Sequence, residues 1–331
     1  PRLAPVPAYA IMSQVQALFC APIGRRGGKG RDVDYAKAHI VTLWCAVIAK
    51  ATRGVTKLLP KQMTPLQFRL LAQLTLPESE RVLPMRAARL LVLKPADVDE
   101  AVGVLADRDL LRVCDDGCIE LTRAGRERAA RLTERLNAFF ALCVDDLSEE
   151  ERAVLADLLR RAFSMPGSCY ARRPLAGEAS EAFDARRGLA ATAMLHYAVQ
   201  TAVKKATSLS LTDFRFLLEL YPKRRTAARM LRARDMVAFL RTGRAYVTTA
   251  SVRLEEQGYL VRVPDERDAR GILFKLTPQG MICVQEVAED LYAVLVSMFG
   301  EAVEERVVQR ALKHLLELED AALDALAELP W

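Results

Sequence analysis

Residues 244–253 read RAYVTTASVR, a stretch with two arginines, two threonines and no acidic side chain. Apolar residues recur there at intervals of three and four, which predicts a helix with one buried face. The side chains predicted to be buried are Val247, Ala250 (or Ser251) and Leu254. Those predicted to face outward are Arg244, Thr248 and Thr249, with Tyr246 and Arg253 at the flank. Arginine can hydrogen-bond to guanine edges or phosphates, and threonine hydroxyls to either, so this face has chemistry suited to nucleic acid.

An ordinary solvated helix face is the alternative interpretation of these residues. It applies most to Arg253 and least to Arg244, which opens the helix directly after a Thr-Gly pair.

The chain contains an internal repeat that places this helix in a larger unit. Phe68 pairs with Phe214 and Arg69 with Arg215 when the two copies are aligned. The aligned blocks are MTPLQFRLLAQL at 63–74 with LSLTDFRFLLEL at 209–220, LADRDLLRV from Leu105 with LEEQGYLVR from Leu254, and LTRAG at 121–125 with LTPQG at 276–280. The offsets are 146, 149 and 155, and the order is the same. This pattern indicates a duplication, because chance similarity of helices would not preserve a third block.

Each copy predicts the same series of elements. A long helix comes first, at 34–59 in the first copy and near 184–207 in the second. A helix with apolar spacing follows, then two short helices and two strands joined by a turn. The apolar positions of that helix are Phe68, Leu71 and Leu74, matched by Phe214, Leu217 and Leu220. In the first copy the turn is CDDGC at 114–118, where Asp-Gly is expected to supply the positive φ angles of a tight hairpin.

Long helices close each copy. They are predicted at 124–163, interrupted near 147–151, and at 279–327, interrupted near Gly300. Ser148 and Glu151 have the spacing of a capping box, which predicts that a new helix starts there.

The first copy differs from the second at the segment that corresponds to residues 244–253. PADVDEAVGV at 95–104 keeps the apolar spacing, but its polar positions are acidic. The predicted buried residues are Val98, Ala101 and Leu105, and the outward ones are Asp97, Asp99 and Glu100. Carboxylates repel phosphates, so this face is not expected to dock on a nucleic acid. The hairpin is also shorter by six residues and has no arginine at its tip.

The segment LEEQGYLVRVPDERDARGILFKLTPQG at 254–280 resembles the recognition-helix end, wing and closing LTxxG of the MarR family of bacterial regulators. LSEEERAVLADLLRR at 147–161 is similar to the C-terminal helices of that family. The resemblance covers about residues 32–327 and is specific in the second copy and degenerate in the first. It implies a mainly α fold with small β-hairpin wings, in which two winged helix-turn-helix units are joined by long helices.

The MarR family implies a homodimer whose long terminal helices interlock and whose two heads face double-stranded DNA. Here both heads lie on one chain, so a single-chain pseudodimer is expected, with two independent domains as the alternative. Self-association of two chains, which would present two competent heads, stays open. The resemblance also places Arg267 and Arg270 at a wing tip that enters the minor groove, with Asp265 and Asp268 bracing them. A surface loop of mixed charge is the alternative.

The same resemblance implies a small, often aromatic, effector between the long helices and each head. Trp44 and Tyr197, on the first helices of the two copies, are the candidates to line such a site. Core packing is the alternative for both, because aromatic residues on an apolar helix face are usually core.

Composition fits a folded protein with more than one core. The chain has 331 residues, 51% apolar and 27% charged, and a formal net charge of +6. The expected organisation is an irregular basic N-terminal extension at 1–31, a first repeat at 32–167 with a degenerate head, and a second repeat at 168–331 with a DNA-competent head. The basic extension could touch DNA backbone without sequence choice. No apolar run is long enough to span a bilayer, so a cytoplasmic protein without membrane contact is expected.

Other chemistries find little support in the residues. The seven cysteines include no CxxC and read as reduced thiols. Cys114 and Cys118 flank the turn of the first hairpin, but no neighbouring base activates them for a redox role. No cofactor, metal site or enzyme is expected, since the three histidines do not cluster and no phosphate loop or catalytic triad has the right context. The sequence therefore predicts a DNA-binding transcriptional regulator. The alternative is a winged-helix protein- or ligand-binding module that uses the acidic helix as its contact surface.

Overall fold

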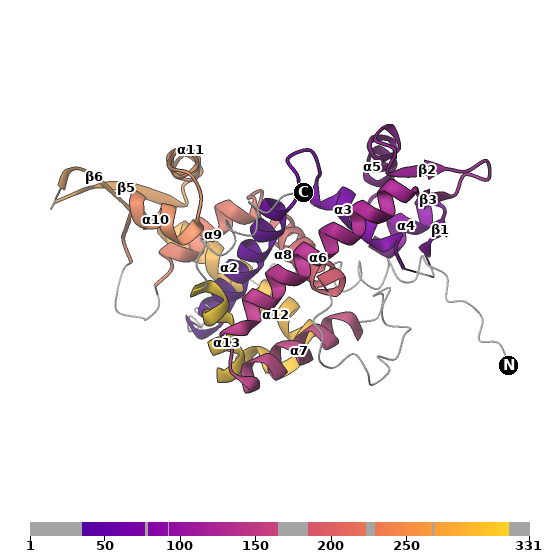
Figure 1. The fold of residues 1–331 in the computed structure, drawn as a ribbon. Helices are drawn as coiled ribbons and strands as arrows, with labels where there is room; N and C mark the ends of the chain where they lie inside the picture. Colours follow the sequence, from indigo (N-terminus) through magenta and orange to yellow (C-terminus); the bar gives the residue numbers. More distant parts are fainter. Residues whose placement is uncertain are drawn as a thin grey trace. The chain divides into compact units, whose positions relative to one another are not determined.

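A computed structural model describes residues 35–76, 79–91, 93–164, 185–222, 229–266 and 268–317. The described residues belong to two compact units, one with residues 50–194 and 313–317 and the other with residues 35–49 and 195–312. Three helices contribute residues to both units. They are α2 (Tyr35–Leu58), α8 (Ala185–Ala206) and α13 (Arg306–Glu317) (Figure 1).

The first unit contains a winged helix-turn-helix head, drawn in purple in Figure 1. Its elements are α3 (Pro65–Gln73), β1 (Arg81–Val82), α4 (Pro84–Leu91), α5 (Pro95–Asp107), β2 (Leu111–Val113) and β3 (Ile119–Leu121). The three strands are antiparallel in the order β1-β3-β2. Phe68, Leu71, Leu105 and Ile119 are completely buried, so the helices and the sheet share one core. We call this part head one.

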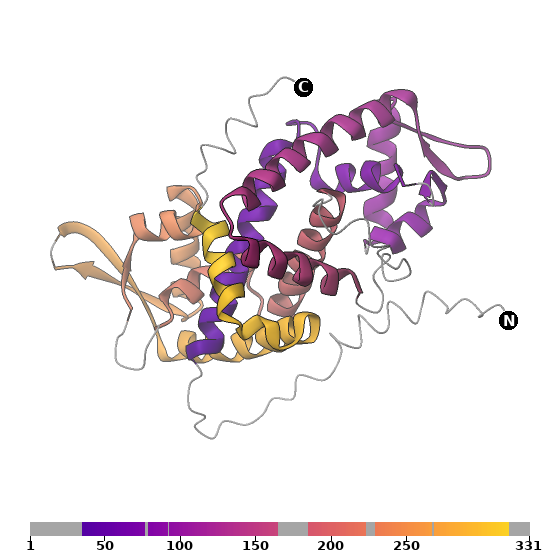
Figure 2. The same ribbon diagram turned by 60° about the horizontal axis from the view of Figure 1, so that its bottom comes forward.

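The second unit contains a head with the same series of elements. They are α9 (Leu211–Leu220), β4 (Leu231–Arg232), α10 (Ala233–Leu240), α11 (Arg244–Glu256), β5 (Leu260–Asp265) and β6 (Asp268–Leu276). The strand order, β4-β6-β5, repeats that of head one. Figures 1 and 2 show β5 and β6 as a long hairpin that extends beyond the helices. Phe216 packs edge-on against Phe274, with ring centroids 5.3 Å apart, and joins α9 to the sheet. We call this part head two.

The long helices lie where the sequence predicts them. They include α6 (Arg123–Asp145), α7 (Glu149–Ser164) and α12 (Pro278–Phe299), followed by the 3₁₀ turn η2 (Gly300–Glu304) and α13. The capping box is confirmed: the Ser148 N–H donates to Glu151 Oε2 at 3.0 Å, and the Glu151 N–H donates to Ser148 Oγ at 3.3 Å. The interruption near Gly300 is confirmed as well. The predicted helix beyond residue 317 lies outside the described residues.

The two arginines that the repeat aligns perform the same task. Arg69 Nη2 donates to the carbonyl of Leu91 at 2.6 Å, and Arg215 Nη2 donates to the carbonyl of Phe239 at 3.4 Å. Both carbonyls lie in the last turn of a short helix, where backbone acceptors have no partner within the helix. Arg69 on α3 therefore caps the C-terminal end of α4, and Arg215 on α9 caps the C-terminal end of α10. In each head, the capped helix is the first of the helix-turn-helix pair.

In each head, the LTxxG motif lies where the start of a long helix comes very close to the backbone that directly precedes the hairpin. The Thr277 hydroxyl donates to the carbonyl of Gly258 at 2.6 Å and also accepts the N–H of Gly280 at 3.0 Å. A Cβ placed on Gly280 would lie 2.0 Å from the carbonyl oxygen of Tyr259. Thr122 and Gly125 make the same contacts in head one, where the Cβ would lie 1.7 Å from the carbonyl oxygen of Leu110. Only glycine fits at this point, so the hairpin and the following long helix are held at a fixed distance.

The turn of the first hairpin differs from the prediction in one respect. Gly117 has a φ of 76°, as expected, but Asp116 is not among the non-glycine residues with positive φ. The Gly117 N–H donates to the carbonyl of Cys114 at 2.8 Å, and Cys118 follows as the first paired residue. This is a three-residue loop with one left-handed residue, so only the glycine of the Asp-Gly pair needs a positive φ. Asp116 instead accepts the N–H of Cys118 and pairs with Arg81.

We predict that Gly125→Ala lowers the free energy of unfolding by about 1–3 kcal/mol or more, because the added methyl group would overlap the backbone carbonyl of Leu110. Urea unfolding followed by circular dichroism measures the change. Gly103→Ala is the matched control in the same unit, since a Cβ there meets nothing within 4 Å and alanine favours the helix. Equal stability of the two variants would contradict the role assigned to the close approach.

Candidate nucleic-acid interface

Helix α11 has the two faces that the sequence predicts. Val247, Ala250 and Leu254 are completely buried, and Ser251 is buried beside them. Arg244, Thr248 and Thr249 are exposed. The helix has the same length as α5, and each of its ends lies 149 positions after the corresponding end of that helix. The spacing of three and four therefore predicted the buried positions of both helices correctly.

The exposed threonines use their hydroxyl hydrogens within the helix. Thr248 Oγ1 donates to the carbonyl of Arg244 and Thr249 Oγ1 to the carbonyl of Ala245, each at 3.1 Å. This back-bonding is common for threonine in helices. In this arrangement each side chain presents an oxygen acceptor and a methyl group to the surroundings.

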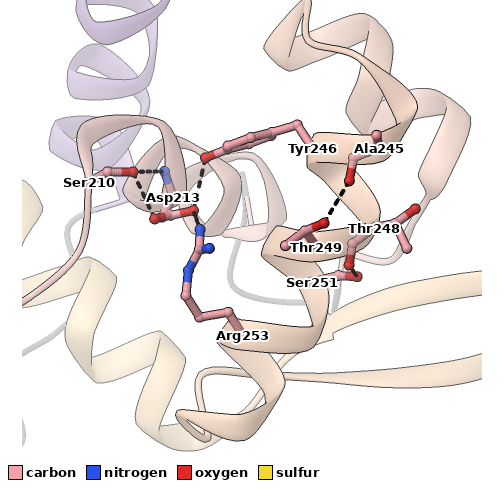
Figure 3. A network of polar contacts seen from close by, with 8 residues as sticks. All are labelled: Ser210, Asp213, Ala245, Tyr246, Thr248, Thr249, Ser251 and Arg253. Atoms are coloured by element: carbon pink, nitrogen blue, oxygen red, sulfur yellow. Dashed lines mark hydrogen bonds and ion pairs between the residues drawn. The ribbon is translucent and has the colours of Figure 1, made fainter.

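Tyr246 and Arg253 are turned toward the body of the head. Both reach Asp213 on α9: Tyr246 Oη donates to Asp213 Oδ1 at 2.9 Å, and Arg253 Nη2 lies 2.5 Å from the same oxygen. Ser210 donates its hydroxyl to Asp213 Oδ2 at 2.7 Å and accepts the Asp213 N–H at 3.1 Å. Figure 3 shows the three side chains converging on this carboxylate, with Thr248 on another side of the helix. Burial and the contact with Asp213 raise the pKa of Tyr246 to about 12.

Asp213 and Ser210 are thus members of the site that the sequence analysis did not include. They lie 33 and 36 residues before Tyr246, so no local spacing connects them with α11. The available signal was the acidic residue at 213 within a helix otherwise rich in buried apolar residues. Asp213 is only 5% exposed, and a buried carboxylate needs partners.

The wing of head two is tied to α11 by an ion pair. Arg262 on β5 donates its backbone N–H to Glu255 Oε1 at 3.0 Å, and its Nε lies 2.6 Å from Glu255 Oε2. These bonds lower the pKa of Glu255. Helix α11 and the first strand of the wing are therefore joined directly.

A second ion pair joins the wing to the first strand of the sheet. Arg232 on β4 lies 2.5 Å from the buried carboxylate of Asp265, a partner that the sequence did not predict. The expected bracing of the wing arginines stays a prediction. Arg267 lies outside the described residues, and for Asp268 and Arg270 the structure describes only the backbone, in β6.

In head one, the helix that corresponds to α11 is α5, and it presents a different surface. Val98, Ala101 and Leu105 are buried in α5, as predicted, while Asp99 and Glu100 are exposed. Asp97 is half-buried, so it faces outward less than expected. Strands β2 and β3 have three residues each, whereas β5 and β6 have six and nine. Head one therefore has an acidic helix and a short wing.

The two aromatic residues proposed to line an effector site lie in different environments. Trp44 is 4% exposed and stacks on Phe299, with ring centroids 4.8 Å apart, so it belongs to the core of the second unit. Tyr197 on α8 is 47% exposed. The structure does not bring the two together in one described pocket.

The described cysteines are free thiols. Burial raises the pKa of Cys45 and Cys143 to about 12 and that of Cys283 to about 11. Desolvation and the nearby Glu120 raise the pKa of Cys114. Within the described ranges, no group of three metal-ligating side chains is present. No helix in the part of the chain described by the structure combines the length and apolar character needed to cross a membrane.

The chain matches no protein-family model and no curated protein. Among solved structures it is similar to wild-type MarR from E. coli in the apo form and to a MarR mutant in which serine replaces a cysteine. Each likeness has 23% sequence identity and a TM-score of 0.27, and covers 31% of this chain and 78% of the other.

We predict that native Cys45, Cys143 and Cys283 react with iodoacetamide at pH 8 several orders of magnitude more slowly than in urea. A raised thiol pKa lowers the fraction of thiolate, which is the reactive form, by about tenfold for each unit by which the pKa lies above the pH. Peptide-resolved mass spectrometry after timed quenching measures each rate separately. Native alkylation of any of the three at its rate in urea would contradict the raised thiol pKa in the folded chain.

Proposed function

We propose that the chain is a DNA-binding transcriptional regulator of the MarR type and that head two binds the duplex through α11. The observation that carries the proposal is the exposed face of this helix, where Arg244, Thr248 and Thr249 lie beside a long hairpin wing. A helix of this kind fits the major groove, and a hairpin beside it can reach the neighbouring groove.

Arg244 is the strongest candidate for a direct contact. It is exposed at the first position of α11 and makes no ion pair within the described part of the chain. The preceding Gly243 supplies no side-chain cap, so the positive end of the helix dipole lies beside the guanidinium. Phosphate is the anion that such a combination binds well, and a guanine edge is the alternative ligand for the arginine.

The threonines suit contacts with base edges. Each presents an acceptor oxygen and a methyl group, because its hydroxyl hydrogen is donated to the helix backbone. An acceptor can bind the amino group of adenine or cytosine, and the methyl group can pack on the methyl group of thymine. Wing arginines 267 and 270 would add contacts in the minor groove.

Contacts shared by the two heads support two parts of the proposal: that the chain arose by tandem duplication, and that it forms an asymmetric single-chain pseudodimer. The aligned arginines and the LTxxG contacts have the same role in both heads, and α2, α8 and α13 each contribute residues to both units. The surfaces, however, have diverged in charge. Since α5 is acidic, one working head per chain is expected, and a palindromic site read equally by both heads is not.

A small aromatic effector belongs to the same proposal. Tyr197 offers an exposed ring on α8, whereas Trp44 is packed in the core. The indole Nε1 of Trp44 is buried without a hydrogen-bond partner in the described part of the chain.

Head one has a second candidate function as a surface for protein contact. Leu83, Met85 and Val113 are 50–55% exposed there. Each lies 149 positions before an arginine of head two, and those arginines are Arg232, Arg234 and Arg262. Head one therefore has exposed apolar side chains at positions where head two has arginines, two of them held in ion pairs. Exposed apolar side chains beside charged ones are typical of protein interfaces.

We predict that Arg244→Ala weakens binding to duplex DNA and makes the dependence on salt shallower by about 0.9 in log–log slope if a phosphate contact is lost. Fluorescence anisotropy over a salt series, with random-sequence and upstream-region duplexes, measures both quantities. Arg152→Ala, on the exposed side of α7, is the charge-matched control and should change neither. Arg267→Ala combined with Arg270→Ala tests the wing in the same assay. If the native chain does not bind at low salt, the regulator proposal fails in this form.

We further predict that Leu83→Ser, Met85→Ser and Val113→Ser, combined in one variant, leave the affinity and the salt slope for duplex DNA unchanged. The reason is that head one contributes no phosphate contact. The variant should also bind less of a hydrophobic dye, since three exposed apolar side chains are removed. A loss of DNA affinity in this variant would show that head one contacts the duplex after all.

A further inference from the structure

We infer that Asp213 is the positioning residue of α11 and that Tyr246 and Arg253 hold the helix in place through it, so that neither is a DNA contact. This inference rests on the proposed function of head two, which it deepens. It also reassigns two of the residues that the sequence placed at the flank of the DNA-binding face.

The first step is the geometry of the carboxylate. Both oxygens of Asp213 are occupied: Oδ1 by Tyr246 Oη at 2.9 Å and Arg253 Nη2 at 2.5 Å, and Oδ2 by Ser210 Oγ at 2.7 Å (Figure 3). The Asp213 backbone is fixed as well, because its N–H donates to Ser210 Oγ at the start of α9. The carboxylate is therefore a buried acceptor with no freedom to turn away, and it belongs to a different helix from the two side chains it receives.

The second step is the spacing of the two side chains on α11. Tyr246 and Arg253 are seven residues apart, which corresponds to two turns and about 10 Å along the helix axis. Seven residues also return the chain to nearly the same side of a helix. Two attachments on one side restrict both the rotation of the helix about its axis and its tilt, which a single attachment cannot do. Arg244, Thr248 and Thr249 are then presented in one orientation.

The third step concerns charge. Arg253 lies at ion-pair distance from a buried carboxylate, and hydrogen bonds of this kind are stronger than neutral ones. Removing the arginine from Asp213 to reach a phosphate would leave a buried, unpaired charge, which is costly. The guanidinium of Arg253 is therefore already neutralised and does not add to the positive charge that the duplex meets.

The fourth step is the comparison with head one, where this arrangement is absent. The positions that correspond to Asp213, Tyr246 and Arg253 are occupied by Gln67, Asp97 and Val104. Gln67 instead accepts the N–H of Thr64 at 3.0 Å and completes a local capping box. The carboxylate anchor is thus found in the head whose recognition helix has a basic exposed end, and it is missing in the head whose helix is acidic.

The test compares the affinity for DNA with its salt dependence. Variants Asp213→Asn, Tyr246→Phe and Arg253→Ala are measured by anisotropy against a random-sequence 24-base-pair duplex and a duplex selected from that pool by the native chain. We expect each variant to lose at least about fivefold in affinity for the selected duplex, with an unchanged salt slope, since no phosphate contact is removed. A slope reduced by about 0.9 for Arg253→Ala, together with unchanged binding by Tyr246→Phe, would overturn the inference.

A second measurement separates this inference from the proposed function. Hydrogen exchange of the α11 amides, measured by mass spectrometry without DNA, should become faster in Asp213→Asn and Tyr246→Phe and stay unchanged in Arg244→Ala. Gln67→Ala, at the equivalent position of α3, is the control and should leave α11 unaffected. Faster exchange without any DNA binding would retain the anchor and reject the regulator. Unchanged exchange in Asp213→Asn would reject the anchor, whether or not the chain binds DNA.

Discussion

Each head contains one point at which three segments meet around a backbone carbonyl. In head two this carbonyl belongs to Tyr259, three residues after the end of α11, and Gly280 lies so close that a Cβ would come within 2.0 Å of its oxygen. The Thr277 N–H donates to the same carbonyl at 3.1 Å, and the Thr277 hydroxyl donates to the carbonyl of Gly258. The end of α11, the start of β5 and the start of α12 are thereby joined within a few residues. The direction of α11 relative to α12 depends on this contact.

The repetition of that contact in head one shows what the two heads share and what they do not. Gly125 meets the carbonyl of Leu110 in the same way, and Asp109 adopts a φ of 54° where Gly258 has 78°. An aspartate tolerates the left-handed region better than most residues, so the backbone path is kept without glycine. The two heads therefore share this backbone arrangement, while their outward side chains differ: they include basic residues in head two and acidic and apolar residues in head one.

The amino-acid sequence predicted the helices and buried positions of each head better than it predicted which side chains make up the candidate interface. Periodicity alone oriented α5 and α11 correctly, because the buried positions of an amphipathic helix repeat at a fixed interval. The LTxxG blocks revealed the repeat, but the reason for the glycine is a contact with a carbonyl 15 or more residues away, which no local pattern contains. The roles of Tyr246 and Arg253 depend on Asp213, 33 and 40 residues earlier. Their position at the flank of the helix was correct, yet spacing cannot tell whether a flanking side chain turns to solvent or to the core.

The arginines of head two show why this distinction matters for function. Arg232, Arg253 and Arg262 each lie within 2.6 Å of a carboxylate, and each of these pairs joins two different elements of the head. An arginine held in this way contributes to the position of the helix and the wing, not to the charge available for phosphate. Arg244 differs, since it is exposed and makes no ion pair within the described residues. In the DNA-binding function proposed for head two, counting all basic residues would therefore overstate the charge available for phosphate. Arg244 is the cation without an ion pair at the exposed end of α11, and the paired arginines help to fix the position of that helix.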